Sequence, residues 1–512
     1  MCRRRLTRAA AFACGLLASG SGWAADRPGL AEIRSAADTV GRLASSFDTS
    51  AGEIFEKAGV LLPALADAAP DPAAVEPASG VAAEPKLGFM PLELLFAQLA
   101  SQTGADYHAD LRAAQASPYP SVLVVKQGTA TLTSLQKAVA GTPLQVSLAG
   151  SGDEVLLHVP LVIWSGATLM LEPGDRLTLD TAAGAFLVSA GRLIATGATI
   201  EGSTAANPWQ TGFRPFIMVA LSGSAELQSS TFRNLGYPDH PYLNGLSFVG
   251  GGLFAASSVS FVRNNRFDHA GSLALYRSAQ MHILGNHFVA SGGPAVLITG
   301  GDDLDLSRNI FAASRGYGVK VTAGADHIAI RSNIIVKNGS HGIFADNLTT
   351  HLSIRDNLIA GNDGAAVRVV QAACVDISGN AAVVNSEKGV SVEGSLAIGV
   401  NGNMIAANGG AGLAIAEQPA AGLTTVSNNV FAANRTGVSG LSFASLKFAG
   451  NDFRQQTPRL LAGELVQYTS QLLSSLADRG GDLSLTSVAL LPAASPAFDA
   501  AAVHDCLEAR TN

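Results

Sequence analysis

Residues 317–338 read YGVKVTAGADHIAIRSNIIVKN, and residues 341–362 repeat the pattern as HGIFADNLTTHLSIRDNLIAGN. Each stretch holds short runs in which apolar and polar residues alternate, separated by turns, and neither leaves room for a helix. Alternation with a period of two is typical of β-strands. A unit of this length that returns along the chain predicts a solenoid in which each unit forms one coil.

One asparagine marks each repeated unit from about residue 245 onward, at spacings of 21, 23, 24, 24, 23, 23, 26 and 22 residues. Leucine-rich repeats have a similar period but need a leucine pattern that this chain lacks. We therefore predict an all-β, right-handed parallel β-helix with apolar side chains inside. The asparagines should hydrogen-bond from coil to coil and adopt left-handed turn conformations, which Asn tolerates. The two sets are Asn265, Asn286, Asn309, Asn333, Asn357, Asn380, Asn403, Asn429 and Asn451, and Asn338, Asn362, Asn385, Asn408 and Asn434.

The chain begins with MCRRRLTRAAAFACGLLASGSGWAAD, which is basic, then apolar, then rich in small residues. The apolar part is shorter than the roughly 20 residues of a membrane-spanning helix, so we predict a Sec-type signal peptide cleaved near Ala24 and a periplasmic protein with no membrane span after cleavage.

The region that follows is rich in Ala and Pro and should be loosely packed, with short helices over 31–43 and 92–103. A helix over 459–476 should cover the C-terminal end of the solenoid. The expected divisions are 1–24, signal peptide; 25–117, N-terminal region with linker; 118–455, β-helix; and 456–512, C-terminal helix and cap.

Removal of residues 1–24 leaves 29 basic and 40 acidic residues, a net charge of −11. This charge argues against nucleic acid or an anionic membrane as the main partner.

Two cysteines then remain, Cys374 and Cys506, and two distant cysteines give neither a disulfide framework nor a zinc site. We interpret them as unpaired or incidentally paired thiols. The sequence predicts no metal site and no cofactor.

Function in such a solenoid must come from side chains that point outward, and strand alternation places Lys320 outward. Its column and the neighbouring one contain Lys320, Asp346, Arg368 and Glu393, whose charges alternate in sign. Asp346 and Glu393 would lie two coils apart, about 9.6 Å on the strand spacing. This is near the upper end of the roughly 6.5–9.5 Å used by inverting glycosidases. A saccharide groove and a ladder of surface ion pairs both remain open. The predicted columns are Ser247, Ala274, Val296, Lys320, Phe344, Arg368, Ser391 and Ala414, and Val249, Tyr276, Ile298, Thr322, Asp346, Val370, Glu393 and Ala416.

Three aspartates in GGDDLDLSRN, Asp302, Asp303 and Asp305, should not converge. The first two are expected in a turn and the third on the outer surface of the next strand. The loop LGYPDHPYLNG carries His240, which either supplies an acid or base over a groove or lies in a surface turn. His287 and His341 are isolated and are interpreted as turn residues.

Several segments together resemble the periplasmic mannuronan C5-epimerase family of alginate biosynthesis. They are VLVVKQGTATL, GATLMLE, GAFLVSAGRLIATGATI, FRPFIMVA, LGY…NGLSF and FDHAGSLALYRSAQMHILGNHF, and the resemblance covers about residues 120–500. It implies a secreted right-handed β-helix. It also implies an Asp-Pro-His-Asp motif whose His is the general base at C5 of the uronate, and an Arg on the next coil that neutralises the carboxylate.

This chain departs from that pattern where the motif belongs. Anchored on Asn309, the motif falls on Val296, Leu297, Ile298 and Thr299, and none of these side chains can serve as a base. The Arg position falls near Ala323, which is not cationic. Both essential parts of the epimerase site are therefore replaced.

Three interpretations follow. The first is a relative with a degenerate site that binds or guides a polysaccharide, which the resemblance would place in a periplasmic export complex. The second is a polysaccharide C5-epimerase or lyase with a relocated site, in which Lys320 or Tyr276 removes a proton and Arg368 offsets the carboxylate charge. The third is a surface or adhesive β-helix without a saccharide role. The substrate-binding candidates are Asp346, Glu393, Phe344 and His240.

Overall fold

A computed structural model describes residues 28–68, 83–104, 108–117, 119–204, 212–237, 240–251, 259–477, 482–486 and 506. The predicted signal peptide lies outside the described residues, as does most of the predicted linker. Asp239 of the loop that carries His240 lies outside them too.

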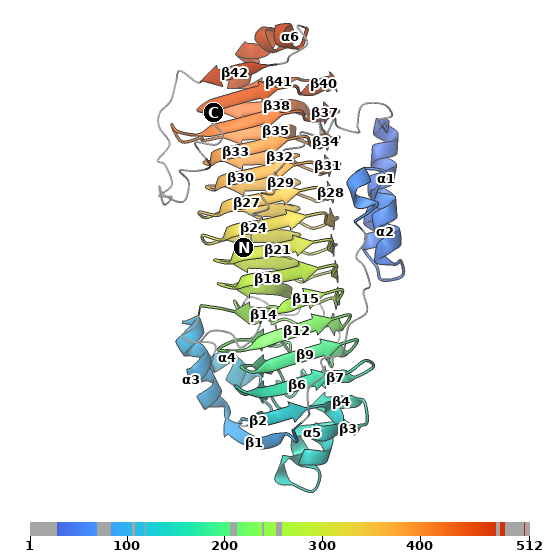
Figure 1. Ribbon diagram of the computed structural model, residues 1–512, viewed down its shortest axis with the longest axis vertical. Coiled ribbons are helices and arrows are strands. Elements are labelled where there is room, and N and C mark those ends of the chain that lie inside the picture. Colours follow the sequence, from blue (N-terminus) through green and yellow to red (C-terminus); the bar gives the residue numbers. More distant parts are fainter. Residues whose placement is uncertain are drawn as a thin grey trace, which may run out of the picture.

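The described chain forms a right-handed parallel β-helix, which confirms the predicted fold (Figure 1). Each coil of the repeat array contributes one strand to each of three sheets, called A, B and C in chain order. Strands of successive coils pair in parallel and in register, so that Lys320 lies beside Phe344 and Phe344 beside Arg368. The antiparallel pairs among the described strands lie at the ends of the solenoid: β1 with β2, β3 with β4, and β39 with β42.

The strands of each sheet are as follows. Sheet A contains β1 (Lys86–Pro91), β2 (Ser121–Ala130), β5 (Leu161–Ile163), β8 (Leu187–Ser189), β11 (Ile217–Val219), β14 (Gly245–Val249), β17 (Ser272–Tyr276), β20 (Val296–Thr299), β23 (Val319–Thr322), β26 (Ile343–Ala345), β29 (Val367–Val370), β32 (Val390–Glu393), β35 (Ala411–Ala416), β38 (Thr436–Leu441) and β41 (Leu461–Gly463). Sheet B contains the end of β2 with β6 (Ala167–Leu171), β9 (Arg192–Thr196), β12 (Ser224–Gln228), β15 (Phe261–Arg263), β18 (Ala279–Leu284), β21 (Asp302–Ser307), β24 (Asp326–Arg331), β27 (Thr350–Arg355), β30 (Ala373–Ser378), β33 (Leu396–Asn401), β36 (Leu423–Ser427), β39 (Ser445–Ala449) and β42 (Leu483–Thr486). Sheet C contains β3 (Leu148–Ser151), β4 (Glu154–Leu157), β7 (Arg176–Leu179), β10 (Thr199–Gly202), β13 (Thr231–Arg233), β16 (Arg266–Asp268), β19 (His287–Val289), β22 (Ile310–Ala312), β25 (Ile334–Val336), β28 (Leu358–Ala360), β31 (Ala381–Val383), β34 (Met404–Ala406), β37 (Val430–Ala432) and β40 (Asp452–Gln455).

Aliphatic and aromatic side chains fill the interior of the coils, because alternate residues of every strand point inward. Phe232, Phe267, Phe288 and Phe311 occupy the same place in four successive coils and stack with ring centroids 5.0, 4.3 and 5.2 Å apart. These side chains are fully buried. The interior is therefore a continuous column of apolar contacts along the solenoid.

Asparagine ladders run along two edges of the solenoid, as the sequence predicts. Asn357 is typical: its side-chain amide donates to Oδ1 of Asn380 at 2.9 Å and to the carbonyl of Ile330 at 2.8 Å. The expected left-handed conformation was wrong for these residues. It belongs instead to the residue before the ladder asparagine, such as Asp356 with φ 53° and Arg308 with φ 57°. The ladder asparagines are buried. They can be buried because their polar groups form hydrogen bonds with the backbone of the turn and with the next asparagine.

Two N-terminal helices cover sheet C along the middle and C-terminal coils (Figure 1). They are α1 (Leu30–Ala44) and α2 (Ala51–Ala58), followed by the short 3-10 helix η1 (Pro63–Leu65). Ser50 caps α2 by accepting from the backbone N–H of Glu53. Apolar residues of both helices pack on the outward aliphatic side chains of sheet C from β22 to β37. The expectation of loose packing was wrong for this part of the N-terminal region, because sheet C is apolar on its outer face as well.

A third helix, α3 (Leu92–Thr103), covers the first coils of sheet A, with α4 (His108–Ala113) beside it (Figure 1). It spans the residues predicted as a helix and ends at Gly104, which has φ 65° and so adopts the left-handed conformation that favours glycine. Its apolar residues pack against outward side chains of β2 to β17 and against Leu297. Sheet A is therefore covered at its N-terminal end, and the coils that follow carry the half-buried side chains described below.

Both ends of the β-helix are capped. At the N-terminal end, α5 (Leu132–Val139) and the 3-10 helix η2 (Pro143–Ser147) place apolar residues on the core. At the C-terminal end, the 3-10 helix η3 (Glu464–Tyr468) and α6 (Thr469–Ala477) bury Leu465 and Leu472 against it. The predicted C-terminal helix is thus present and covers this end, but its first half is a strand and a 3-10 turn.

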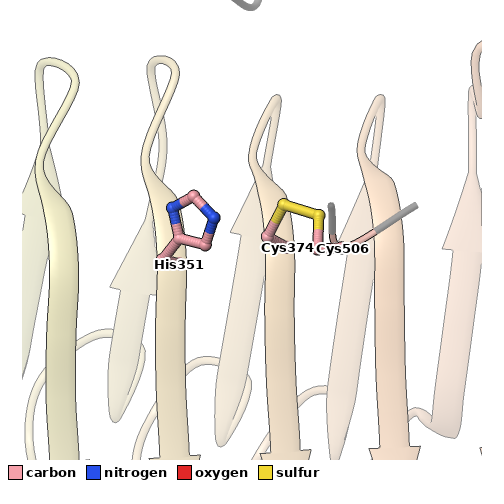
Figure 2. Close-up of side chains that lie close together, drawn as sticks. All are labelled: His351, Cys374 and Cys506. Atoms are coloured by element: carbon pink, nitrogen blue, oxygen red, sulfur yellow. A yellow bond between two sulfur atoms is a disulfide. The ribbon is translucent and has the colours of Figure 1, made fainter. Parts of the chain in front are cut away.

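Cys374 and Cys506 form a disulfide across a sequence separation of 132 residues. Of the two states that the sequence left open, unpaired or incidentally paired thiols, the structure shows the paired one. Cys374 lies on sheet B, one coil beyond His351 (Figure 2). Among the described residues, no helix has the length and apolarity to cross a bilayer.

Candidate functional site

The outward face of sheet A between β23 and β32 holds most of the predicted site residues. Lys320, Phe344, Arg368 and Ser391 occupy one position in four successive strands, as the sequence predicts. They belong to the part of sheet A that lies beyond the residues packed against α3. This face is the candidate functional site.

The coil before Lys320 departs from the predicted columns by one residue. Lys320 lies beside Leu297 and Thr322 beside Thr299, whereas Val296 and Ile298 are fully buried in the core. The prediction that Val296 and Ile298 point outward was therefore wrong. The turn after β20 contains two residues, 300–301, whereas the turn after β23 contains three, 323–325. If outward positions are assigned by counting back a fixed number of residues from the ladder asparagine, the assignment is off by one residue where the turn is shorter. A shift of one residue exchanges the inward and outward faces of a strand.

An aromatic–cation cluster lies at the centre of the open face; it consists of Tyr317, Lys320, His341, Phe344, Arg368 and Glu393. The rings of Tyr317 and Phe344 stack with centroids 5.1 Å apart and an interplanar angle of 14°. The Nζ atom of Lys320 lies 5.7 Å from the first centroid and 5.6 Å from the second. The guanidinium carbon of Arg368 lies 5.9 Å from the Phe344 centroid. These are distances at which a cation is attracted to a ring face.

His341 completes the aromatic surface, with its ring centroid 5.8 Å from Tyr317 and 5.7 Å from Phe344. Its Nδ1 accepts a hydrogen bond from the backbone N–H of Ala365 at 2.8 Å, so the neutral ring carries its hydrogen on Nε2. Burial lowers the pKa of His341, and the positive charge of Arg368 lowers it further. At neutral pH this imidazole is therefore a hydrogen-bond donor at Nε2 and not a base.

The four alternating charges do not form a continuous ladder of ion pairs. Among the described residues, one pair joins them: Nη2 of Arg368 and Oε2 of Glu393 are 3.1 Å apart. Lys320 lies over the aromatic rings instead. Asp346 lies on the same face, and its Oδ1 is shielded from solvent with no hydrogen-bond partner among the described residues. The face therefore offers two cations, two rings and one carboxylate oxygen without a partner.

Tyr276 and Arg368 are not brought together. Tyr276 lies on β17, four coils from Arg368 on β29, which is about 19 Å on the strand spacing. Its hydroxyl accepts from the backbone N–H of Tyr242 at 3.0 Å and from the amide of Asn244 at 3.1 Å. Burial raises the pKa of Tyr276. A buried, hydrogen-bonded phenol with a raised pKa is poorly suited to remove a proton from a substrate on this face.

The remaining predicted positions lie outside the cluster. His240 stacks near Tyr237, with ring centroids 4.2 Å apart, in the loop before β14. Ala323 lies in the turn after β23 with φ 60°. At the positions where the sequence analysis expects the epimerase motif, the outward side chains are those of Leu297 and Thr299, which are neither acids nor bases.

Tyr317 and His341 were missed as site residues in the sequence. They lie in the turns that lead into β23 and β26, and turn residues do not follow the strand alternation used to predict outward positions. Their spacing in the sequence could have identified them. Tyr317 lies three residues before Lys320, and His341 lies three residues before Phe344. Aromatic rings at equivalent turn positions of adjacent coils are expected to lie close together.

Comparisons with known proteins agree on the fold. The family model described as the right handed beta helix region matches residues 187–359 and 250–405. The solved structure of the periplasmic alginate epimerase AlgG is similar, with a TM-score of 0.53 and 16% identity over 73% of this chain and 83% of that one. The A-module of the Azotobacter vinelandii mannuronan C-5 epimerase AlgE6 gives a TM-score of 0.35 at 13% identity, over 59% and 91% of the two chains. No curated protein sequence matches the chain. At this identity, the similarity to AlgG shows a shared β-helix fold.

Proposed function

We propose that the aromatic–cation cluster binds an acidic polysaccharide whose chain runs across the coils of sheet A. The observation that carries this proposal is the stacked pair Tyr317 and Phe344 with Lys320 and Arg368 beside it. Flat aromatic faces provide apolar contact area for the C–H groups of a sugar ring. Lysine and arginine provide the charge for its carboxylate, and the planar guanidinium suits a carboxylate especially well.

The role is binding or guiding rather than catalysis. A base for a C5 proton needs a lone pair that faces the substrate. In the cluster, Nδ1 of His341 is occupied by a backbone N–H, and Glu393 is engaged by Arg368. Leu297 and Thr299, which point outward where the sequence alignment puts the epimerase motif, are neither acids nor bases. The cluster thus supplies recognition groups without the acid–base pair of an epimerase.

The proposed location is the periplasm, where the chain would hold or guide a polymer during export. The N-terminal sequence supports this through its signal-peptide pattern. The disulfide between Cys374 and Cys506 supports it independently, because such bonds persist in oxidising compartments. AlgG, which shares the fold, is a periplasmic alginate epimerase, and this supports a uronate polymer as the ligand class.

Calorimetric titration of the mature chain with oligomannuronate, oligoguluronate and a neutral oligoglucan tests the proposal. Uronate oligomers should bind and the neutral oligomer should not, and added salt should weaken binding. Phe344→Ala and Lys320→Ala should each weaken binding about ten-fold. Tyr119→Ala and Lys447→Ala are matched controls, because both residues are exposed and lie outside the cluster. If the chain binds none of the uronate oligomers, or if the control variants lose as much affinity as the cluster variants, the results would favour a surface β-helix without a saccharide role.

Asp346 favours a second candidate, a uronate C5-epimerase or lyase. Its Oδ1 lacks a hydrogen-bond partner among the described residues, and it lies two positions from Phe344 on the same face. Incubation of polyuronate with the chain in deuterated water separates the candidates. Deuterium at C5, or unsaturated ends detected by ultraviolet absorbance, would establish the enzyme if Asp346→Asn or Lys320→Ala abolished the signal. Binding without exchange or cleavage would support the non-catalytic role.

A further inference from the structure

Sheet B carries a cluster of two imidazoles and a carboxylate that the proposed polysaccharide site does not use. Asp326 and His327 begin β24, and His351 lies at the position equivalent to His327 on the adjacent strand β27. The two imidazole rings stack with centroids 4.6 Å apart and an interplanar angle of 9°. Nitrogen or oxygen atoms of all three residues lie within 4.8 Å of one another.

The backbone holds both histidines in an uncommon conformation. His327 has φ 49° and His351 has φ 44°, and the equivalent residues of neighbouring coils, Asp303 and Cys374, also have positive φ. Each coil therefore presents one side chain from a left-handed residue at the start of its sheet B strand. In the next coil that place is taken by Cys374, whose sulfur is bonded to Cys506 and is not free to bind a metal (Figure 2).

The carboxylate of Asp326 contacts both imidazoles. Its Oδ1 is 2.8 Å from Nδ1 of His351, and its Oδ2 is 3.1 Å from Nδ1 of His327. The hydroxyl of Thr350 also donates to Oδ1, at 2.7 Å, which fixes the carboxylate in place. A second carboxylate approaches from the preceding coil: Oδ1 of Asp302 is 3.4 Å from Nδ1 of His327. Two imidazole nitrogens and the carboxylate of Asp326 thus lie close together on β24 and β27, and Asp302 of β21 approaches this group at His327.

We propose that Asp326, His327 and His351 bind a divalent transition-metal ion of the Zn²⁺ type, with Asp302 as a further carboxylate ligand. Imidazole nitrogen suits zinc, copper and nickel, whereas Mg²⁺ and Ca²⁺ prefer oxygen ligands alone. Zinc bonds to nitrogen and oxygen are about 2.0–2.2 Å long. The ligand atoms of Asp326, His327 and His351 already lie within 4.8 Å of one another, and the side chain of His327 is exposed to solvent.

Such an ion would join three successive coils beside the coil held by the disulfide. Two carboxylates would balance the charge of a divalent ion, and the imidazoles would bind as neutral ligands. The ion would therefore tie β21, β24 and β27 together on the sheet that carries the Cys374–Cys506 bond.

The experiment uses the mature, untagged chain, freed of metal by dialysis against a chelator and then titrated calorimetrically with Zn²⁺. We expect one equivalent to bind with micromolar or tighter affinity and to raise the thermal unfolding midpoint. His327→Asn and His351→Asn are suitable variants, because asparagine tolerates the left-handed backbone. Each should weaken binding at least ten-fold. His282→Ala is the matched control: this exposed histidine of the same sheet faces a single carboxylate, Asp305, at 3.7 Å.

Any of three results would overturn the proposal. The chain does not bind Zn²⁺, it binds Mg²⁺ or Ca²⁺ as tightly as Zn²⁺, or the double variant His327→Asn/His351→Asn binds Zn²⁺ with unchanged affinity. An equal loss in His282→Ala would show non-specific binding by surface histidines and would overturn it as well. Circular dichroism establishes that each variant is folded. If a histidine variant unfolds, the variant Asp326→Asn, which keeps both imidazoles, is used to test the site instead. Full Zn²⁺ affinity in Asp326→Asn would contradict the proposed site.

Discussion

His287 and Ala44 are 243 residues apart in the sequence, and Nε2 of His287 donates a hydrogen bond to the carbonyl oxygen of Ala44 at 2.7 Å. Ala44 is the last residue of α1, where carbonyl groups lack partners within the helix. The ring of Phe47 packs edge-on against the imidazole, with centroids 4.8 Å apart. This contact joins the N-terminal helices to sheet C through a buried, titratable side chain.

Protonation of His287 should therefore weaken the fold. Burial lowers its pKa to about 4; the hydrogen bond to Ala44 opposes this decrease, and the positive charge of Arg266 adds to it. In the unfolded chain the same group takes up a proton near pH 6.5. Between these values the unfolded state binds more protons, so the free energy of unfolding should fall as pH falls from about 6.5 to about 4, by roughly 3 kcal/mol at most.

Urea unfolding at a series of pH values measures this slope. The variant His287→Gln keeps an N–H donor and cannot titrate, so its stability should change less over the same pH range than that of the unmodified chain. Asp38→Asn is a control at the same interface, because Asp38 pairs with Lys337 at 3.0 Å on an exposed surface. It should retain the pH slope of the unmodified chain. Identical slopes with and without His287 would contradict the prediction.

The asparagine ladder should be a source of stability and not of activity. Asn357→Ala removes the donors to Ile330 and Asn380 and the acceptor for Asn333, all buried. Buried groups left without partners should lower the free energy of unfolding by about 2–4 kcal/mol. Asn347→Gly is the control, since Asn347 is exposed and has φ 51°, a conformation that glycine adopts readily. Denaturant unfolding should separate the two variants, while uronate binding by both stays at the level of the unmodified chain.

Loss of the disulfide should destabilise the chain. The bond between Cys374 and Cys506 restricts the unfolded ensemble across 132 residues. The double variant Cys374→Ser/Cys506→Ser should therefore lower the free energy of unfolding by about 2–5 kcal/mol. Unfolding of the unmodified chain with and without a thiol reductant provides the comparison. Reductant should shift the unmodified chain toward the variant and leave the variant unchanged; a shift in the variant would point to another cause.

Glu393 should compete with a bound carboxylate for Arg368. The two side chains are paired at 3.1 Å and each is about one-third exposed. Glu393→Gln keeps the shape and removes the competing charge, so uronate oligomers should bind about two- to five-fold more tightly, as expected for loss of a weak surface pair. Titration calorimetry measures this change, and Lys447→Ala, at an exposed position outside the cluster, is the control. Weaker binding by Glu393→Gln would instead show that Glu393 orients Arg368 or contacts the ligand directly.

The sequence by itself determined the β-helix. A unit of 21–26 residues with alternating strands and a recurring asparagine permits stacked coils and excludes a helical repeat. It also identified the outward positions of Lys320, Phe344 and Arg368, because each lies between two apolar residues that point into the core, as strand alternation predicts. These features are local or periodic, so each coil predicts the next.

Only the tertiary structure decided what covers each face and which groups meet across it. A turn shorter by one residue reversed the faces of Val296 and Ile298, and no sequence periodicity reports the length of a single turn reliably. The packing of α1 on sheet C and the Cys374–Cys506 bond join segments more than 100 residues apart. His327 and His351 are separated by 24 residues, the length of one coil, yet their convergence on Asp326 depends on a left-handed backbone at both. Periodicity fixes the repeating scaffold, whereas long-range contacts and exceptions to the repeat fix the sites.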